Sequence, residues 1–254
     1  MSSPTRLYQK IGLSLKNRIA NGEFLVGEKL PPERELAETM NVSRSVIREA
    51  LIMLELNNIV NVRKGSGVYV LQIPTKIATP QETTSVNLDK NKSDSGPFEL
   101  LQARQFLESH IAEFAATQIT KKDISKLRRA LEIEQLDLEG AGDNYRGDEM
   151  FHIAIAEATQ NSVLADMVRN LWINRKSSPM WRQLHLHINE QNYRQQWLED
   201  HHHILACLLR RDPLGSRQAM WQHLDNVKQT LFSLSDIDDP QFDGYLFNKN
   251  PIAS

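Results

Sequence analysis

The stretch from Leu30 to Gly67 constrains the fold of this 254-residue chain more than any other. Its first part has the sequence LPPERELA and predicts a short helix, because proline is tolerated in a first helical turn and the glutamates favour the positive end of the helix dipole. Asn41 ends that helix, and Ser43 is a good N-cap for a second one. Two helices joined this tightly predict a helix-turn-helix.

The second helix has two faces with different chemistry. The apolar face, expected to pack on a core, comprises Val46, Ala50, Leu51 and Leu54. The opposite face, expected to meet solvent, comprises Arg44, Ser45, Arg48 and Glu49. Two arginines one turn apart can enter a DNA major groove, where arginine pairs with guanine O6 and N7 and hydroxyls reach phosphate.

A predicted hairpin follows this helix. Two β-branched runs, Ile59–Val62 and Val68–Leu71, are joined by the basic, glycine-rich segment Arg63–Gly67. This pattern predicts a wing, the hairpin that accompanies some helix-turn-helix units. Helix pairs with ordinary surface arginines are common, and they are the alternative interpretation. The wing at this distance favours DNA binding.

These motifs resemble the winged helix-turn-helix of the GntR family of bacterial regulators. The matching patterns are LPPERELA, VSRSVIREAL and the Gly65-Ser66-Gly67 wing. The resemblance covers about the first 70 residues. By position it implies DNA contacts from Arg34, Ser43, Arg44, Ser45, Arg48, Lys64 and Gly65.

Charge and composition place only weak limits on the possible functions. The net charge is −2, but residues 1–73 have a net charge of +3 and the remainder −5, so attraction to phosphate is local. A single cysteine, Cys207, excludes an intrachain disulfide and fits a reducing compartment. We expect a cytoplasmic protein, since no signal peptide or membrane-spanning run is apparent.

The chain divides into four segments. Residues 1–73, whose first helix is expected at Leu7–Ala20 with Leu7, Ile11, Leu15 and Ile19 buried, form the winged helix-turn-helix. Residues 74–96 are a polar linker. Residues 97–235 form an all-helical antiparallel bundle, and residues 236–254 a tail whose Tyr245–Phe247 can dock. The helices of the bundle are expected at Phe98–Ile119, Thr120–Leu138, Asn144–Gln160, Ser162–Lys176, Trp181–His187, Asn189–Arg211 and Pro213–Leu234.

Histidines lie on core-facing stripes of several of these helices. Asp148 and His152 share one helical face, and His201 and His223 lie in apolar stripes of two other helices. An imidazole in a core needs a partner, and these four side chains could meet at one cation. A core histidine is more often bonded to a carbonyl or carboxylate, so spacing alone leaves the metal site open. His202 is an alternative ligand.

The second domain resembles the ligand-binding domain of the FadR-type branch of the GntR family. Its metal-binding pattern matches DEMFH, DHHHIL and MWQHL, which selects Asp148, His152, His201 and His223 and leaves His202 and His203 outside. Zinc is the first expectation for this donor set, and nickel or manganese also fit. The resemblance also implies that Arg104 holds a carboxylate effector. Arg175 is a second candidate, with a surface role as the alternative.

The likeness extends over nearly the whole chain to enterobacterial repressors of hexuronate utilisation. It implies a homodimeric transcriptional repressor that binds an inverted-repeat operator and is released by a small sugar acid. Two other functions stay open: a metal-responsive regulator in which the cation is the effector, and a metal-dependent hydrolase fused to a DNA anchor. The hydrolase needs a general base, for which Glu149 and Glu157 are the nearest candidates.

Overall fold

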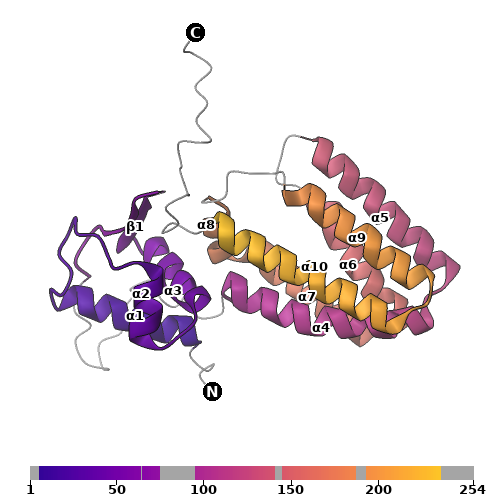
Figure 1. Cartoon of the computed structure of the whole chain (residues 1–254), viewed down its shortest axis with the longest axis horizontal. Helices are drawn as coiled ribbons and strands as arrows, with labels where there is room; N and C mark the ends of the chain where they lie inside the picture. Colours follow the sequence, from indigo (N-terminus) through magenta and orange to yellow (C-terminus); the bar gives the residue numbers. More distant parts are fainter. Residues whose placement is uncertain (1–5, 64, 75–94, 141–144, 187–192, 236–254) are drawn as a thin grey trace, which may run out of the picture. The chain divides into compact units, whose positions relative to one another are not determined.

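The computed structural model describes residues 6–63, 65–74, 95–140, 145–186 and 193–235. These residues are mainly helical and include one two-stranded hairpin (Figure 1). The first elements are α1 (Leu7–Ala20), α2 (Glu33–Met40), α3 (Arg44–Leu56), β1 (Val60–Arg63) and β2 (Gly67–Val70). They are followed by α4 (Pro97–Gln118), α5 (Lys121–Glu139), α6 (Arg146–Ala158), α7 (Ser162–Ser177), α8 (Pro179–Leu186), α9 (Tyr193–Leu209) and α10 (Pro213–Leu234). The predicted fold class is confirmed.

The helix-turn-helix is formed by α2 and α3. Its turn passes through Asn41, whose φ of 53° lies in the left-handed region that asparagine tolerates better than most residues. Ser43 then caps α3, its hydroxyl accepting a hydrogen bond from the Val46 N–H. α1 packs on α3, where Leu15 and Ile47 are fully buried. The two helices are therefore held at a short turn over a common core.

The wing is an antiparallel hairpin in which Val60 pairs with Val70 and Arg63 with Gly67. Each strand is displaced by one residue from its predicted range. Gly67 is required here, because its φ is +118° and a Cβ would lie 2.3 Å from the Cε atom of Lys29. The Lys29 side chain thus lies directly against Gly67, the first residue of β2 after the tip.

The helices α4, α5, α6, α7, α9 and α10 lie alongside one another as a bundle (Figure 1). The predicted capping box opens α5: the Asp123 N–H donates to the Thr120 hydroxyl at 3.3 Å, and the Thr120 N–H donates to the Asp123 carboxylate at 3.0 Å. α5 packs on α6 and α9. Phe151 and Trp172 are fully buried at the centre of the bundle. The metal ligands predicted from sequence all lie on helices of this bundle.

The chain forms two compact units that do not follow its linear order. One contains residues 1–98, 178–189 and 232–254, and the other contains residues 99–177 and 190–231. α8 and the last turn of α10 therefore belong with the helix-turn-helix, whereas the sequence placed all of 97–235 in one domain. Within the first unit, α8 packs on α3.

Some local expectations differ from the structure. Leu7 is 53% exposed, so its assignment to the buried stripe of α1 is wrong; Tyr8 is buried in its place. α9 is described from Tyr193 on, and its expected start at Asn189 lies outside the described residues. Most of the expected linker, residues 75–94, and the whole tail, including Tyr245–Phe247, lie outside the described residues.

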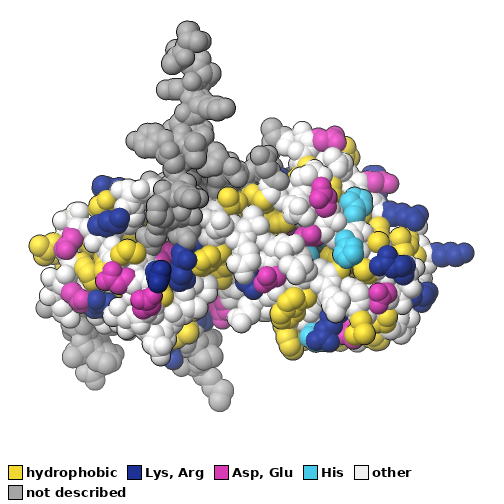
Figure 2. All heavy atoms as spheres, in the orientation of Figure 1, with side chains coloured by type: hydrophobic (Ala, Val, Ile, Leu, Met, Phe, Trp, Pro, Cys, Tyr) yellow, Lys and Arg dark blue, Asp and Glu magenta, His cyan; other side chains and the backbone are white. Residues whose placement is uncertain are grey.

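Two surface properties complete the description. Among the described helices, none combines the length and apolar character needed to cross a membrane. Figure 2 shows acidic and basic side chains interspersed over the visible face, in keeping with the small net charge of the chain.

Candidate functional site

Most of the expected DNA-contacting side chains lie at the start of the recognition helix. The Arg44 side chain is 37% exposed, and the Ser43 and Ser45 hydroxyls lie 2.9 Å apart. Arg34 on α2 is 82% exposed and pairs with Glu38 at 3.1 Å. A surface ion pair of this kind is weak and can be exchanged for a phosphate contact.

The wing contributes an exposed tip. Gly65 has a φ of 65° and is exposed, which leaves backbone groups of the tip accessible. Lys64, the basic residue expected to contact DNA, lies outside the described residues. Arg63, the last residue of β1 before the tip, stacks its guanidinium 4.3 Å from the Tyr69 ring centroid.

Arg48 and Glu49 are not on the solvent-facing side of α3, and that expectation is wrong. Each is only 3% exposed. Arg48 Nε donates to Glu33 Oε1 at 2.9 Å, and Arg48 Nη1 donates to the Ser235 hydroxyl at 2.9 Å and to the Phe232 carbonyl. Sequence periodicity could not predict this burial, because the partners come from other elements. Contact of Arg48 with DNA stays a prediction, and it requires this buried pair to open.

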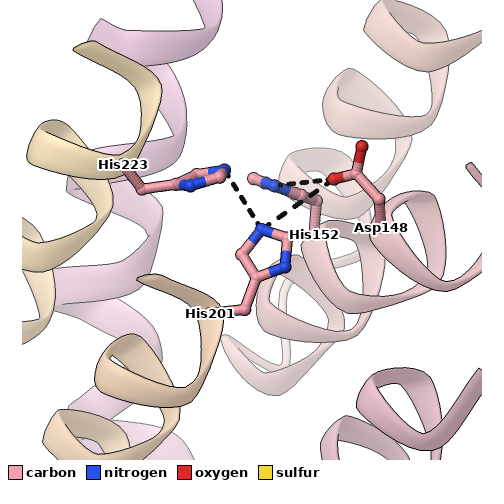
Figure 3. Close-up of side chains that lie close together, drawn as sticks. All are labelled: Asp148, His152, His201 and His223. Atoms are coloured by element: carbon pink, nitrogen blue, oxygen red, sulfur yellow. Dashed lines mark hydrogen bonds and ion pairs between the residues drawn. The ribbon is translucent and has the colours of Figure 1, made fainter. Parts of the chain in front are cut away.

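The four predicted metal ligands converge at the centre of the bundle (Figure 3). Asp148 and His152 come from α6, His201 from α9 and His223 from α10. All four are buried, with exposed fractions of 8% or less. His202 and His203 are exposed, so the alternative ligand His202 is excluded. The four side chains that the resemblance selected therefore lie close together, and their role as metal ligands stays a prediction.

The donor atoms are spaced as a small cation needs. His201 Nε2 lies 3.0 Å from His223 Nε2, His152 Nε2 lies 3.3 Å from Asp148 Oδ1, and His201 Nε2 lies 3.9 Å from the same oxygen. All the ligand atoms lie within 4.8 Å of one another. A tetrahedral zinc ion with bonds of about 2.0–2.1 Å holds its ligand atoms about 3.3 Å apart. Three imidazoles and a carboxylate in this arrangement fit a divalent cation.

Each histidine has a carboxylate behind it. His201 Nδ1 lies 2.7 Å from Glu134 Oε2, His223 Nδ1 lies 3.4 Å from Asp200 Oδ2, and His152 Nδ1 is bonded to Glu108 Oε2. A carboxylate that accepts the Nδ1 proton fixes the tautomer whose Nε2 lone pair faces inward. This backing orients all three imidazoles toward one point. It is the arrangement that supports metal-binding histidines.

Electrostatics shift the pKa values of these groups in different directions. Burial lowers the pKa of His152, but the charge of Glu108 and the bonds to Asp148 and Glu108 outweigh burial and raise it. Burial by itself raises the pKa of Glu108, but the charges of Arg104 and His152 outweigh it and lower the pKa to about 2. Burial likewise opposes ionisation of Asp148, yet its bonded His152 helps to bring the pKa far below the usual range. Burial and the neighbouring imidazoles lower the pKa of His223 to about 3. An ionised carboxylate and a neutral imidazole are the states that bind metal.

The two predicted effector residues are both buried beside this cluster. Arg104 Nε donates to Glu108 Oε1, one helical turn further along α4, at 2.7 Å. Arg104 Nη2 is buried without a hydrogen-bond partner in the described part of the chain. Arg175 is 6% exposed, so a surface role is wrong; burial lowers its pKa, while the charge of Asp148 opposes that shift.

Sequence reasoning missed the backing carboxylates. Glu134 of α5 and Asp200 of α9 each support a histidine. Glu134 lies on a face shared with Leu127 and Leu131, and an acidic residue on an apolar stripe is a usable signal. Its partner, however, lies 67 residues away and is set only by packing.

The nearest candidates for a general base do not face the cluster. Glu149 pairs with Lys176 at the surface, and Glu157 pairs with Lys126 at 2.7 Å and with Arg169. Both carboxylates are therefore committed to surface ion pairs. The arrangement supports binding and orientation of a ligand, whereas hydrolysis would require a base aimed at a metal-bound water.

Comparison with known proteins finds two family matches along the chain. Residues 7–70 match the family described as bacterial regulatory proteins, gntR family, and residues 99–226 match the FCD domain. The chain is 49% identical to the Uxu operon transcriptional regulator of Escherichia coli (strain K12), over 99% of this chain and 96% of that protein. It is 47% identical to the Exu regulon transcriptional regulator of the same strain, over 100% and 95% respectively. A solved structure of Streptococcus agalactiae GntR is 28% identical, with a TM-score of 0.43, over 88% of this chain and 99% of that one.

Proposed function

Since this chain belongs to the GntR family of bacterial regulatory proteins and contains an FCD domain, we propose that it represses genes of hexuronate catabolism. Members of the family are DNA-binding transcriptional regulators, and the relatives found are regulators rather than enzymes. The effector is a sugar acid that binds the helical domain and releases the operator. The names of the Uxu operon and Exu regulon regulators, and the resemblance to hexuronate-utilisation repressors, support this choice.

The DNA contacts are assigned to the start of α3 and to the wing. Arg44 is the main base-contacting residue, with Ser43 and Ser45 on phosphate and Lys64 and Gly65 at the wing. Because one recognition helix and wing cover a half-site, the protein acts as a homodimer on an inverted repeat. Arg48 supports this surface indirectly, since its partner Glu33 also lies 3.9 Å from Arg44 Nη2.

A divalent cation is held by Asp148, His152, His201 and His223. The nitrogen-rich donor set favours zinc, and nickel or manganese bind according to supply. When bound, the cation supplies a positive centre that attracts an effector carboxylate. Arg104 offers the second contact, because its Nη2 is a buried donor that has no acceptor among the described residues.

The observation on which the effector assignment depends is the pairing of that Arg104 donor with a converging metal cluster. The test is calorimetry of metal-loaded and metal-free protein with D-glucuronate, D-galacturonate, D-fructuronate and neutral glucose. One sugar acid should bind, more tightly with metal, and glucose far more weakly. Arg104→Lys keeps the charge beside Glu108 but loses the planar guanidinium, so it should weaken binding of the acid. Arg128→Lys, on the exposed face of α5, is the matched control.

Operator DNA distinguishes the remaining alternative, in which the cation itself is the effector. If the sugar acid induces, acid and operator must weaken each other by the same factor, because coupling between two sites is reciprocal. A metal-responsive regulator would instead lose or gain operator affinity when chelator is added in the absence of sugar acid. Equal operator affinity with and without the sugar acid contradicts the proposed induction.

A further inference from the structure

Three buried arginines in the helical unit are linked through aromatic rings. The guanidinium carbons of Arg104 and Arg175 lie 4.5 and 4.6 Å from the Trp172 ring centroid. Those of Arg175 and Arg194 lie 4.5 and 4.6 Å from the Tyr145 ring centroid. The result is a continuous series, here called the arginine ladder, that leads from the metal cluster to Arg194.

We propose that Arg194 and the hydroxyls beside it form the far end of the effector site, where they bind hydroxyl groups remote from the carboxylate. This proposal depends on the proposed function, in which the carboxylate binds at the metal and Arg104. Nothing in the motif patterns identified Arg194, which lies in the first turn of α9.

The burial of Arg194 is the first argument. It is 4% exposed, and arginine is among the side chains least often buried to this extent. Stacking on Tyr145 occupies a face of the guanidinium, whereas its N–H donors point outward in the guanidinium plane. The Tyr145 and Tyr193 hydroxyls lie 3.1 Å apart, so this end of the ladder combines donors and acceptors. Vicinal hydroxyls of a sugar need that combination.

Unpartnered donors along the ladder are the second argument. Trp172 Nε1 and Arg104 Nη2 are both buried, and the described residues offer neither a hydrogen-bond partner. Leaving a buried donor without an acceptor is costly, so such groups mark places where a ligand can supply acceptors. Both donors belong to residues at the end of the arginine ladder nearest the metal cluster. A ligand bound there therefore meets further polar groups toward Arg175.

Charge balance defines the class of ligand. The carboxylates in or behind the cluster are Glu108, Glu134, Asp148 and Asp200, and the ladder arginines are Arg104, Arg175 and Arg194. With neutral imidazoles and a divalent cation, one positive charge is left over. A ligand with a single carboxylate neutralises it, whereas a dicarboxylate or a sugar phosphate brings an excess of negative charge into a low-dielectric site. The site therefore favours a hydroxylated monoacid long enough to follow the ladder.

A pair of probes of different length tests the assignment. L-lactate has a carboxylate and one hydroxyl and can use only the metal and Arg104, whereas a hexuronate also extends toward Arg194. The titrations use metal-loaded full-length protein and whichever of D-glucuronate, D-galacturonate and D-fructuronate binds wild type most tightly. Arg194→Lys, which keeps the charge and loses the planar stack, should weaken the hexuronate by about tenfold or more and leave lactate unchanged.

Tyr193→Phe provides a milder variant that removes only a hydroxyl. It should weaken the hexuronate in the same direction, with metal content and melting temperature unchanged. Arg128→Lys is again the surface control. If both variants bind the hexuronate as wild type does, or if lactate and hexuronate weaken equally, Arg194 is structural and the proposal is overturned. If wild type binds no hexuronate at all, the proposed function itself fails first.

Discussion

The two compact units each bury a cluster of charged side chains, and the clusters differ in what their groups can still bind. In the helix-turn-helix unit, every guanidinium nitrogen of Arg48 donates to an acceptor: Glu33, the Phe232 carbonyl or the Ser235 hydroxyl. The Phe232 ring lies 4.0 Å from the same guanidinium. In the helical unit, the imidazoles bind carboxylates through Nδ1 and direct Nε2 at one another.

This difference separates a cluster whose groups bond to one another from a cluster that could hold a cation. Two Nε2 atoms 3.0 Å apart cannot both donate a proton, and at most one hydrogen bond satisfies them. A cation can bind the inward-facing nitrogen and oxygen lone pairs all at once. In the Arg48 cluster, every guanidinium nitrogen already donates to an acceptor, so a ligand would gain no comparable contact. Buried charge alone is therefore a poor indicator of function, and the direction of the remaining lone pairs is a better one.

The largest effect is expected when a proposed metal ligand is removed. His223→Ala should reduce bound metal from about one ion per chain to none and lower the melting temperature. A ligand at roughly 1,000 times its Kd stabilises the folded state by about 4 kcal/mol, and that contribution disappears. Elemental analysis and thermal unfolding with and without chelator measure both. His203→Ala, which alters an exposed imidazole of α9, is the control and should retain metal. Metal retained after loss of His223 contradicts the assignment.

An effect of similar size is expected from the Arg48 cluster. Arg48→Ala removes the guanidinium that donates to both oxygens of the buried Glu33 carboxylate, which should cost about 3–5 kcal/mol of unfolding free energy. Arg44→Ala removes a half-exposed side chain and should cost less than about 1 kcal/mol, while it weakens operator binding by about 1–3 kcal/mol. Denaturant unfolding and gel-shift titration of both variants separate stability from DNA contact. If Arg48→Ala is as stable as Arg44→Ala, the buried pair is not structural.

The backing carboxylates test whether orientation matters to the metal cluster. Glu134→Gln removes the charge that fixes His201 and should weaken metal binding by about 10–100-fold. Glu132→Gln changes an exposed glutamate of the same helix, 64% exposed in an ion pair with Arg129, and is the matched control. Competition with a metal indicator dye gives both affinities. Equal affinities would show that the imidazoles are oriented without the carboxylate.

The smallest effect is expected at the start of α5, where Thr120 and Asp123 hydrogen-bond to each other. Burial raises the pKa of Asp123, but hydrogen bonds from Thr120 outweigh it and lower the pKa. A depressed folded-state pKa stabilises the protein above the unfolded value of about 3.9, and the contribution is lost as pH falls through the folded pKa. Asp123→Ala should therefore cost about 1 kcal/mol at neutral pH and progressively less below about pH 4. A difference in melting temperature independent of pH would contradict this.

The sequence alone determined the local structure and which imidazoles lie on core-facing stripes. Ser43, Asn41 and Thr120 act on backbone groups two to four residues away, so their roles follow from the chain itself. His201 and His223 fall on apolar stripes because helical periodicity is also local, and resemblance then selected them over His202.

Only the tertiary structure decided which buried charges are satisfied. Glu33 meets Arg48 across 15 residues, Glu134 meets His201 across 67, and the Ser235 hydroxyl meets Arg48 across 187. Periodicity specifies the face on which a side chain lies, but not the element packed against that face. Arg48 was expected to contact DNA, but it is buried. Arg194 was not predicted to be a site residue, but it lies on the arginine ladder. Both outcomes depend on long-range packing, because a charged side chain is buried only where another element brings its partners.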